Sequence, residues 1–136
     1  MAEMTGGCQC GAVRYSLDKM PEAVFVCHCT DCRKQTSSAF ALVAVIPEEQ
    51  FHMDRGKVRT FESVAASGRA KTQAFCPDCG SRIWHRIEWR PGKLSIRAGT
   101  LDSPGVLEPG AHLWTSEKLP WVIVPEGVKT FEKQPG

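Results

Sequence analysis

In several short segments of this chain, apolar side chains recur at every second position, which is typical of strands with one buried face. The clearest alternation covers residues 12–17 and returns in residues 82–88. A longer apolar run, residues 38–46, stops at Pro47 and indicates a buried strand. Shorter strands are predicted at residues 23–26, 71–75, 93–98 and 112–114. The pattern therefore predicts a mainly β protein.

Turn residues predict how some of these strands are joined. The Arg-Pro-Gly sequence at residues 90–92 predicts a tight turn between the strands on either side of it. Gly56 predicts a second hairpin, formed by residues 51–53 and 57–61.

One short helix is predicted after the strand at residues 23–26. Thr30 can cap its N-terminus, so that the helix begins near Asp31 and Cys32 lies in the first turn. Residues 1–7 carry no pattern and are expected to be loose. The four tryptophans are expected to be core anchors or pocket walls: Trp84, Trp89, Trp114 and Trp121.

Length and composition support this picture. The chain has 136 residues, which suits one domain over residues 1–136 with a core of about residues 7–131. Twelve glycines and nine prolines indicate many turns and short elements. We therefore expect a single mainly β domain with short helical turns.

Charge and hydropathy narrow the classes of partner. Lys and Arg total 17 against 15 Asp and Glu, and no basic block is present to follow a phosphate backbone, so no nucleic-acid partner is expected. The longest apolar run, residues 39–47, is far shorter than the roughly 20 residues of a membrane helix. The N-terminus has neither a basic nor an apolar signal segment, so we expect a cytoplasmic protein.

The seven cysteines carry the candidate chemistry. They stand as two pairs and one triple: Cys8-Gln9-Cys10, Cys76-Pro77-Asp78-Cys79 and Cys27-His28-Cys29-Thr30-Asp31-Cys32. An odd count, these spacings and a reducing compartment favour metal-bound thiolates over disulfides.

The cysteines divide naturally as four plus three. A structural zinc site takes four protein ligands, whereas a working site keeps three and leaves one position open. We therefore expect Cys8, Cys10, Cys76 and Cys79 to hold one zinc ion, and Cys27, Cys29 and Cys32 to hold a second. Two alternatives remain: the triple recruits one cysteine of the second pair, or the cysteines hold an iron–sulfur cluster. The second alternative lacks the repeated Cys-x-x-Cys run of bacterial ferredoxins.

Three thiolate ligands favour a particular chemistry at the open site. They already bring three negative charges, so the metal is a weaker Lewis acid than zinc held by three histidines. Capture of a soft fourth ligand is then favoured over activation of water. The triple therefore predicts a zinc site that binds or activates a small thiol.

These motifs resemble the glutathione-dependent formaldehyde-activating enzyme (Gfa) family, which also includes centromere protein V. The cysteine motifs are in register with it, each with its flanking residues: Gly11, Arg33, Phe75, Pro77 and Gly80. The Pro47…Phe51…Gly56 spacing and the His112…Ser116-x-x-x-Pro120-Trp121 segment add support. The resemblance extends from Gly7 to about Phe131.

The resemblance implies a β-tent fold, the same four-plus-three division of the zinc ligands, and a second zinc that is exchanged or lost when glutathione binds. It also implies a carbon–sulfur lyase activity, in which formaldehyde and glutathione give S-(hydroxymethyl)glutathione. Cys27, Cys29 and Cys32 would then be the catalytic residues. Other hypotheses are a non-catalytic carrier of thiol or adduct, a zinc-stabilised protein-binding module, and a zinc or redox buffer.

Four residues near the triple are candidate substrate contacts. Arg33 and Lys34 can bind a carboxylate of glutathione, or they can form a solvated basic turn. His28 can act as a base for an incoming thiol, or it can point to solvent or a neighbouring carbonyl. Phe40 can line a pocket. His85 and His112 are expected to be structural, and His52 to lie on the surface.

Overall fold

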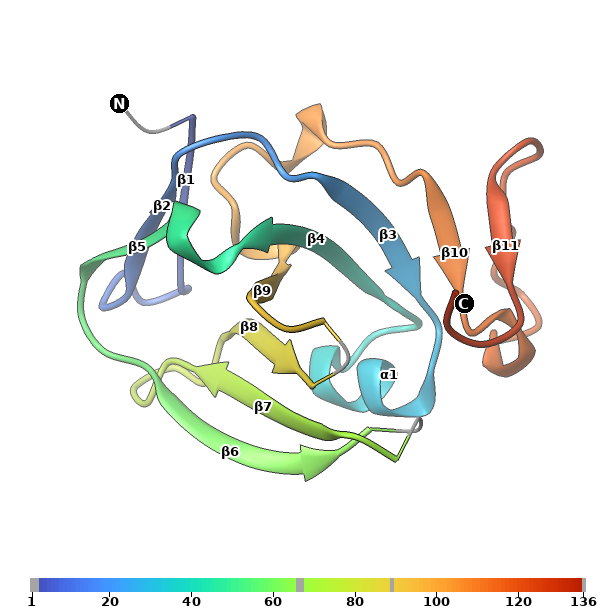
Figure 1. The fold of residues 1–136 in the computed structure, drawn as a ribbon, viewed down its shortest axis with the longest axis horizontal. Coiled ribbons are helices and arrows are strands. Elements are labelled where there is room, and N and C mark those ends of the chain that lie inside the picture. The colour runs from blue at the N-terminus through green and yellow to red at the C-terminus, as the bar shows by residue number, and fades with distance from the viewer. Residues whose placement is uncertain (1–2, 66–67, 89, 136) are drawn as a thin grey trace.

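The computed structural model describes residues 3–65, 68–88 and 90–135, and these residues form two β-sheets and one α-helix (Figure 1). The strands are β1 (Met4–Gly7), β2 (Arg14–Leu17), β3 (Ala23–Cys27), β4 (Ala41–Pro47), β5 (Phe51–Arg55), β6 (Arg59–Val64), β7 (Ala70–Phe75), β8 (Arg82–Ile87), β9 (Lys93–Arg97), β10 (Ala111–Leu113) and β11 (Lys129–Phe131). The helix α1 spans Thr30–Thr36, and 3-10 turns cover Glu48–Gln50, Ala98–Thr100, Pro104–Val106 and Thr115–Glu117. The predicted mainly β fold with short helical turns is confirmed.

The two sheets differ in size and order. The small sheet has the order β1-β2-β5 and is antiparallel throughout. The large sheet has the order β11-β10-β3-β4-β9-β8-β7-β6. Within it, β10 is parallel to both β3 and β11, and the other pairs are antiparallel. Figure 1 shows the small sheet at one end of the molecule and β10 and β11 at the other.

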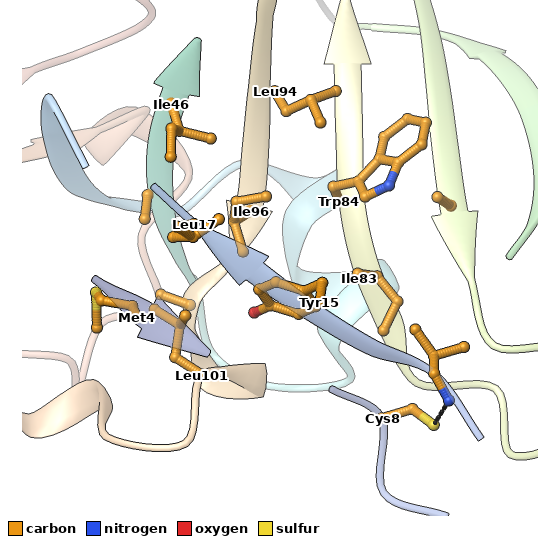
Figure 2. Packing of buried hydrophobic residues seen from close by; sticks show 14 of the residues in the cluster. Met4, Cys8, Tyr15, Leu17, Ile46, Ile83, Trp84, Leu94, Ile96 and Leu101 are labelled. Atoms are coloured by element: carbon orange, nitrogen blue, oxygen red, sulfur yellow. Dashed lines mark hydrogen bonds between the residues drawn. The ribbon is translucent and has the colours of Figure 1, made fainter. Parts of the chain in front are cut away.

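The main core lies where β2 packs against the large sheet. Tyr15 and Leu17 of β2 are fully buried against Ile83 and Ile96, as Figure 2 shows. The Tyr15 hydroxyl shares a 2.7 Å hydrogen bond with Thr100 Oγ1, so its polar end is also satisfied. Burial raises the pKa of Tyr15 to about 12, which keeps the phenol neutral at physiological pH.

A second buried cluster contains the cysteine triple. Phe25 and Cys27 of β3 pack there with Val43 of β4 and Leu113 of β10. Helix α1 contacts β4 and adds Cys32 to this cluster. The triple is therefore part of a hydrophobic core and does not lie on an exposed loop.

The hairpin predicted at Gly56 is wrong. Strand β5 pairs with β2, with Phe51 opposite Leu17, whereas β6 pairs with β7 in the other sheet. The chain leaves one sheet and enters the other at Gly56, which has a φ of 78° and packs against the Ala12 carbonyl. The alternation of apolar residues in short segments does not distinguish a hairpin turn between two paired strands from a connection that leads from one sheet to the other.

The expectation that residues 1–7 are loose is wrong for residues 4–7, whereas residues 1–2 lie outside the described part of the chain. Residues 4–7 form β1, which pairs with β2, and the Met4 side chain is buried. Two glycines allow this close approach, because a Cβ at Gly6 would lie 2.6 Å from the Tyr15 ring. The segment shows no apolar alternation because Met4 is its one large apolar side chain, and pairing with β2 holds the rest.

The tryptophans divide between the interior and the surface. Trp84 is buried in the main core and Trp114 packs against the second cluster. Trp121 is 71% exposed, so its expected place in the core is wrong; Val122 takes the buried position in that segment. Trp89 lies outside the described residues.

The helix begins one residue earlier than predicted. Cys29, not Thr30, is the N-cap, because its Sγ accepts a 3.3 Å hydrogen bond from the Cys32 amide. The hydroxyl of Thr30 instead donates to Glu117 Oε1 at 2.8 Å. The cap is thus formed by a candidate metal ligand.

Replacing Gly56 with alanine should destabilise the fold strongly. The new Cβ would clash with the Ala12 carbonyl, and alanine would be strained in the left-handed backbone conformation of this position. Together the two effects should lower the free energy of unfolding by about 3 kcal/mol. The measurement is denaturant unfolding of the metal-loaded protein. Gly92→Ala is the matched control: Gly92 has a φ of 76° with open space around it, and strain alone should cost about 1 kcal/mol. Equal losses in the two variants would contradict the packing argument.

Candidate metal centre

The first cysteine cluster joins two loops from different sheets. Cys8 and Cys10 follow β1, whereas Cys76 and Cys79 lie between β7 and β8. The four Sγ atoms all lie within 4.8 Å of one another. Because β1 belongs to the small sheet and β7 to the large one, this cluster bridges the two sheets.

The spacing of these sulfurs fits a tetrahedral zinc ion. Zinc–sulfur bonds of about 2.3 Å in a tetrahedron place the sulfurs about 3.8 Å apart. The Cys8 and Cys10 sulfurs are 3.6 Å apart, and those of Cys10 and Cys76 are 3.8 Å apart. The donor set is therefore arranged as a four-thiolate site requires.

Hydrogen bonds around this cluster favour a thiolate at Cys8 and at Cys79, and they connect its two loops. The Val13 amide donates to Cys8 Sγ at 3.2 Å. The Ser81 hydroxyl accepts from the Gln9 amide at 3.1 Å and lies 3.2 Å from Cys79 Sγ, to which it can donate. The hydrogen bond from Ser81 lowers the pKa of Cys79 to about 5, so this thiol ionises readily.

The second cluster contains Cys27, Cys29 and Cys32, whose sulfurs also lie within 4.8 Å of one another. Strand β3 ends at Cys27, Cys29 caps α1, and Cys32 lies in its first turn. All three are buried, in contrast to the exposed Cys10 of the first cluster. Since the cysteines meet in the four-plus-three groups that their spacing predicted, neither cluster borrows a ligand from the other.

The electrostatic surroundings of the triple favour an ionised sulfur at Cys32. The neighbouring sulfurs of Cys27 and Cys29 lower the pKa of Cys32 most, and the charges of Arg97 and Lys71 lower it further. Burial raises the pKa of Cys32; its effect is smaller than that of the two sulfurs but larger than that of either cation. A preformed thiolate is the form that binds a metal.

A small cavity of about 50 Å³ opens beside the triple. Its walls include the apolar side chains of Phe25, Ile87, Leu113 and Trp114, and the polar side chains of Asp31, Lys71, His85, Arg90 and Gln134. One water needs about 10–15 Å³ by this kind of measure, so the cavity holds a few waters or the thiol end of a ligand.

A wider groove of about 860 Å³ adjoins this cavity. Phe25, Arg90 and Leu113 line both spaces, so the groove and the cavity share a wall. The guanidinium of Arg90 lies 5.0 Å from the centre of the Phe25 ring and donates to Ser95 Oγ at 3.0 Å. These contacts hold the side chain at the boundary between the two spaces.

The structure places His28 away from solvent. Its side chain is fully buried, and its Nε2 shares a 2.8 Å hydrogen bond with His112 Nδ1. The His28 ring also meets Phe40 edge to face at 5.7 Å. Burial lowers the pKa of His28 to about 4, so the ring is neutral at physiological pH. Neither His28 nor Phe40 is among the described residues that line the cavity; Phe40 lines a separate groove together with Lys34 and Cys79.

The structure also separates Arg33 and Lys34 from the cavity. Both lie on α1 beside a shallow surface depression with Ser37 and Ser38, and Lys34 is exposed. Arg33 Nη2 donates to Thr30 Oγ1 at 3.2 Å, within its own helix. Neither is among the described residues lining the cavity.

Other residues take the positions around the triple, and sequence reasoning did not single out their roles. Lys71, Arg90 and Arg97 supply the positive charge near the sulfurs, and His85 lines the cavity, where burial holds its pKa well below the usual value. The available signal in the sequence was a lysine or arginine within a segment that alternates like a strand. To use that signal, one would need to know which face of the strand lies toward the triple.

The fold and the two clusters define a class: a mainly β domain with a four-cysteine and a three-cysteine cluster, each of which could hold a metal ion. The sequence model of the glutathione-dependent formaldehyde-activating enzyme family matches residues 3–117. The chain therefore belongs to that family, and the resemblance seen in its cysteine motifs is confirmed.

A solved structure shares this fold. The crystal structure of a Rhodobacter sphaeroides protein is similar to the chain with a TM-score of 0.62 and 20% sequence identity. The match covers 78% of this chain and 97% of that one. In the part of the chain that the structure describes, no helix is long and apolar enough to cross a membrane.

Breaking the four-cysteine cluster should unfold the protein more readily than breaking the triple. Cys76→Ser removes a ligand that joins distant segments, so we expect a fall in melting temperature of about 10 °C or more. Cys29→Ser is the matched comparison, because serine keeps an oxygen that can cap α1 and the triple closes only a local segment. Thermal unfolding and metal analysis of both variants test this. A larger fall in Cys29→Ser would contradict the bridging role.

Proposed function

We propose that this protein is a two-zinc enzyme whose three-cysteine site binds a small thiol, glutathione in the first instance, and joins its sulfur to a carbonyl carbon. Cys8, Cys10, Cys76 and Cys79 would hold the structural ion, and Cys27, Cys29 and Cys32 the second. The observation that carries the proposal is the buried triple with a cavity beside it, in a chain of the formaldehyde-activating family.

The metal supplies one kind of chemistry at the triple: a zinc ion with a vacant position favours the ionised form of a thiol. The chain's own residues do the rest. Phe25, Leu113 and Trp114 form the apolar walls, which limit water around the reacting sulfur. Lys71 lines the same cavity and adds a positive charge that favours a thiolate.

The reaction itself requires little from the protein beyond this placement. The ligand sulfur forms a bond to the carbonyl carbon of formaldehyde, and the proton lost by the thiol ends on the carbonyl oxygen. His85 lines the cavity, and its neutral ring has a buried Nδ1 that has no hydrogen-bond partner among the described residues. That atom is available to exchange a hydrogen bond with the ligand, which makes His85 a candidate for orienting it.

The size of the cavity decides how glutathione would lie. Only a thiol end fits beside the triple, so the rest of a tripeptide must lie outside it. The groove that shares Phe25, Arg90 and Leu113 with the cavity has the volume for such a ligand, within the usual range for small-molecule sites. The proposal therefore places the ligand sulfur at the triple and the ligand body in this groove.

Native mass spectrometry with and without glutathione tests the proposal. We expect two zinc ions per chain and a glutathione complex, which Cys29→Ser should abolish while the first zinc and the fold remain. S-methylglutathione is the matched ligand, because it keeps the peptide and lacks a free thiol; it should not bind measurably. Wild-type protein that ignores glutathione, or that binds both ligands equally, would refute thiol capture at the triple.

A further inference from the structure

The wall of the cavity beside the triple carries two polar side chains, Lys71 and Gln134, among apolar ones. A thiol end presents a sulfur and apolar carbons, which use the apolar walls. The lysine ammonium can act on the sulfur by its charge, but an amide oxygen has nothing to accept from a bound thiolate, which has no proton. Because a buried polar group without a partner costs free energy, the wall indicates that a second polar group enters the cavity.

Strand pairing directs Lys71 into this cavity. Lys71 pairs with Ile87 across β7 and β8, and Gln73, two residues along β7, pairs with His85. Residues paired across neighbouring strands share a face, and along one strand every second residue does. Ile87 and His85 line the cavity, so the face that carries Lys71 is the cavity face. The Lys71 side chain is buried, and none of the ion pairs among the described residues involves it.

Gln134 reaches the cavity from the C-terminal segment. The Trp114 amide donates to the Lys133 carbonyl at 3.2 Å. The Ser116 hydroxyl donates to the Glu132 carbonyl at 2.7 Å, so the residues just before Gln134 are held against the segment that follows β10. Its Oε1 is buried and has no hydrogen-bond partner among the described residues. Gln134 also lies beyond the matched residues 3–117, so membership of the family does not account for it.

A donor and an acceptor in one wall match an oxygen that becomes a hydroxyl. The Lys71 ammonium only donates hydrogen bonds, and the Gln134 amide oxygen only accepts them. A carbonyl oxygen accepts, whereas a hydroxyl both accepts and donates. In the reaction proposed above, the sulfur–carbon bond forms, the carbon–oxygen double bond becomes single, and the proton that the thiol lost to solvent is regained from solvent on the oxygen. Lys71 can therefore donate to this oxygen throughout, and Gln134 gains a hydrogen bond when the hydroxyl forms.

The volume of the cavity agrees with two reactants of this size. At 10–15 Å³ for each water-sized group, about 50 Å³ holds about four such groups. The sulfur and first carbon of a thiol take two of these places. The carbon and oxygen of formaldehyde take the other two, so both reacting ends fit together.

We propose that Lys71 and Gln134 form an oxygen-binding subsite in the cavity, which binds the carbonyl oxygen of the second reactant and the hydroxyl of the adduct. This inference rests on the proposed thiol binding at the triple and adds the residues that bind the other reactant. As the sulfur attacks the carbonyl carbon, negative charge develops on that oxygen. A fixed donor in a site with little water stabilises this charge.

A purely electrostatic role for Lys71 makes a different prediction. As a charge that favours a thiolate, Lys71 would strengthen the binding of all thiols alike. An oxygen-binding subsite instead distinguishes a thiol that carries a hydroxyl from one that does not. A cavity that was merely apolar would favour the thiol without a hydroxyl. The hydroxyl of the ligand is therefore the variable to change.

The experiment measures by calorimetry how the zinc-loaded protein binds two thiols of equal size, 2-mercaptoethanol and 1-propanethiol, which differ by a hydroxyl in place of a methyl group. Each affinity is expressed per ionised thiol, so the different acidities of the ligands do not enter. The wild type should bind 2-mercaptoethanol about tenfold more tightly, as a hydrogen bond to a charged group predicts. The ratio of the two affinities is compared between variants, because a general effect of Lys71 on the bound sulfur cancels in it.

Two variants of the subsite should lower this ratio. Lys71→Met keeps the length of the side chain and removes the ammonium, so the ratio should fall to about one or below. Gln134→Ala should reduce it about threefold, as the loss of a neutral hydrogen bond predicts. Lys57→Met is the matched control: Lys57 is exposed and lines neither the cavity nor the adjoining groove, so the ratio should stay at the wild-type value.

The rate of adduct formation is a second readout. It is followed by exchange NMR with saturating glutathione and formaldehyde, and the uncatalysed rate is subtracted. Lys71→Met should lower the rate about 100-fold, which is the usual effect of removing one donor to a developing oxyanion. A rate within twofold of the wild type, in a variant that still binds glutathione, would contradict the subsite.

The outcomes separate this inference from the function on which it rests. If no thiol binds the wild type, the proposed function fails and the subsite fails with it. If 1-propanethiol binds the wild type as tightly as 2-mercaptoethanol, or if Lys71→Met leaves the ratio unchanged, thiol binding stands and the subsite is refuted. Should Lys71→Met lose zinc or fail to fold, the wild-type ratio and Gln134→Ala decide, and an unchanged ratio in Gln134→Ala then refutes the subsite.

Discussion

The convergence of four cysteine sulfurs between two loops is the constraint on which the rest of this structure depends. The small sheet adds only β1, β2 and β5, and it meets the large sheet through the Tyr15 core and through this cluster. A metal bound there ties residue 8 to residue 79, which greatly restricts the unfolded chain. A metal-loaded cluster would thus hold the sheet interface in place, and the large sheet in turn carries the triple.

The two cysteine clusters differ in whether their surroundings leave room for a further ligand. The four-cysteine cluster is partly exposed, but it already offers the four donors of a closed tetrahedral site, and Val13 and Ser81 form hydrogen bonds with its sulfurs. The triple is buried among apolar side chains, beside a cavity and buried cations. Three candidate ligands, an adjoining space and the charge of Lys71 in its wall are together what an anionic fourth ligand would require.

Much of the site followed from the sequence, because the spacing of cysteines is local. Cys-x-Cys and Cys-x-x-Cys place two sulfurs on one side of a turn whatever the rest of the fold does. The division into four and three followed from counting ligands. The candidate contacts His28, Arg33 and Lys34 were chosen for nearness in sequence, and the structure places none of them among the described residues of the cavity wall.

The sequence by itself determined the class of fold and both groups of cysteines. Alternation depends only on the two-residue repeat of a strand, so strands such as β2 and β8 were visible without knowing their partners. Tertiary structure alone decided that β5 joins β2 and that Lys71 and Arg97 face the triple. Strand pairing and burial are set by long-range packing, and a lysine or arginine in an alternating strand looks the same whether it meets water or a thiolate.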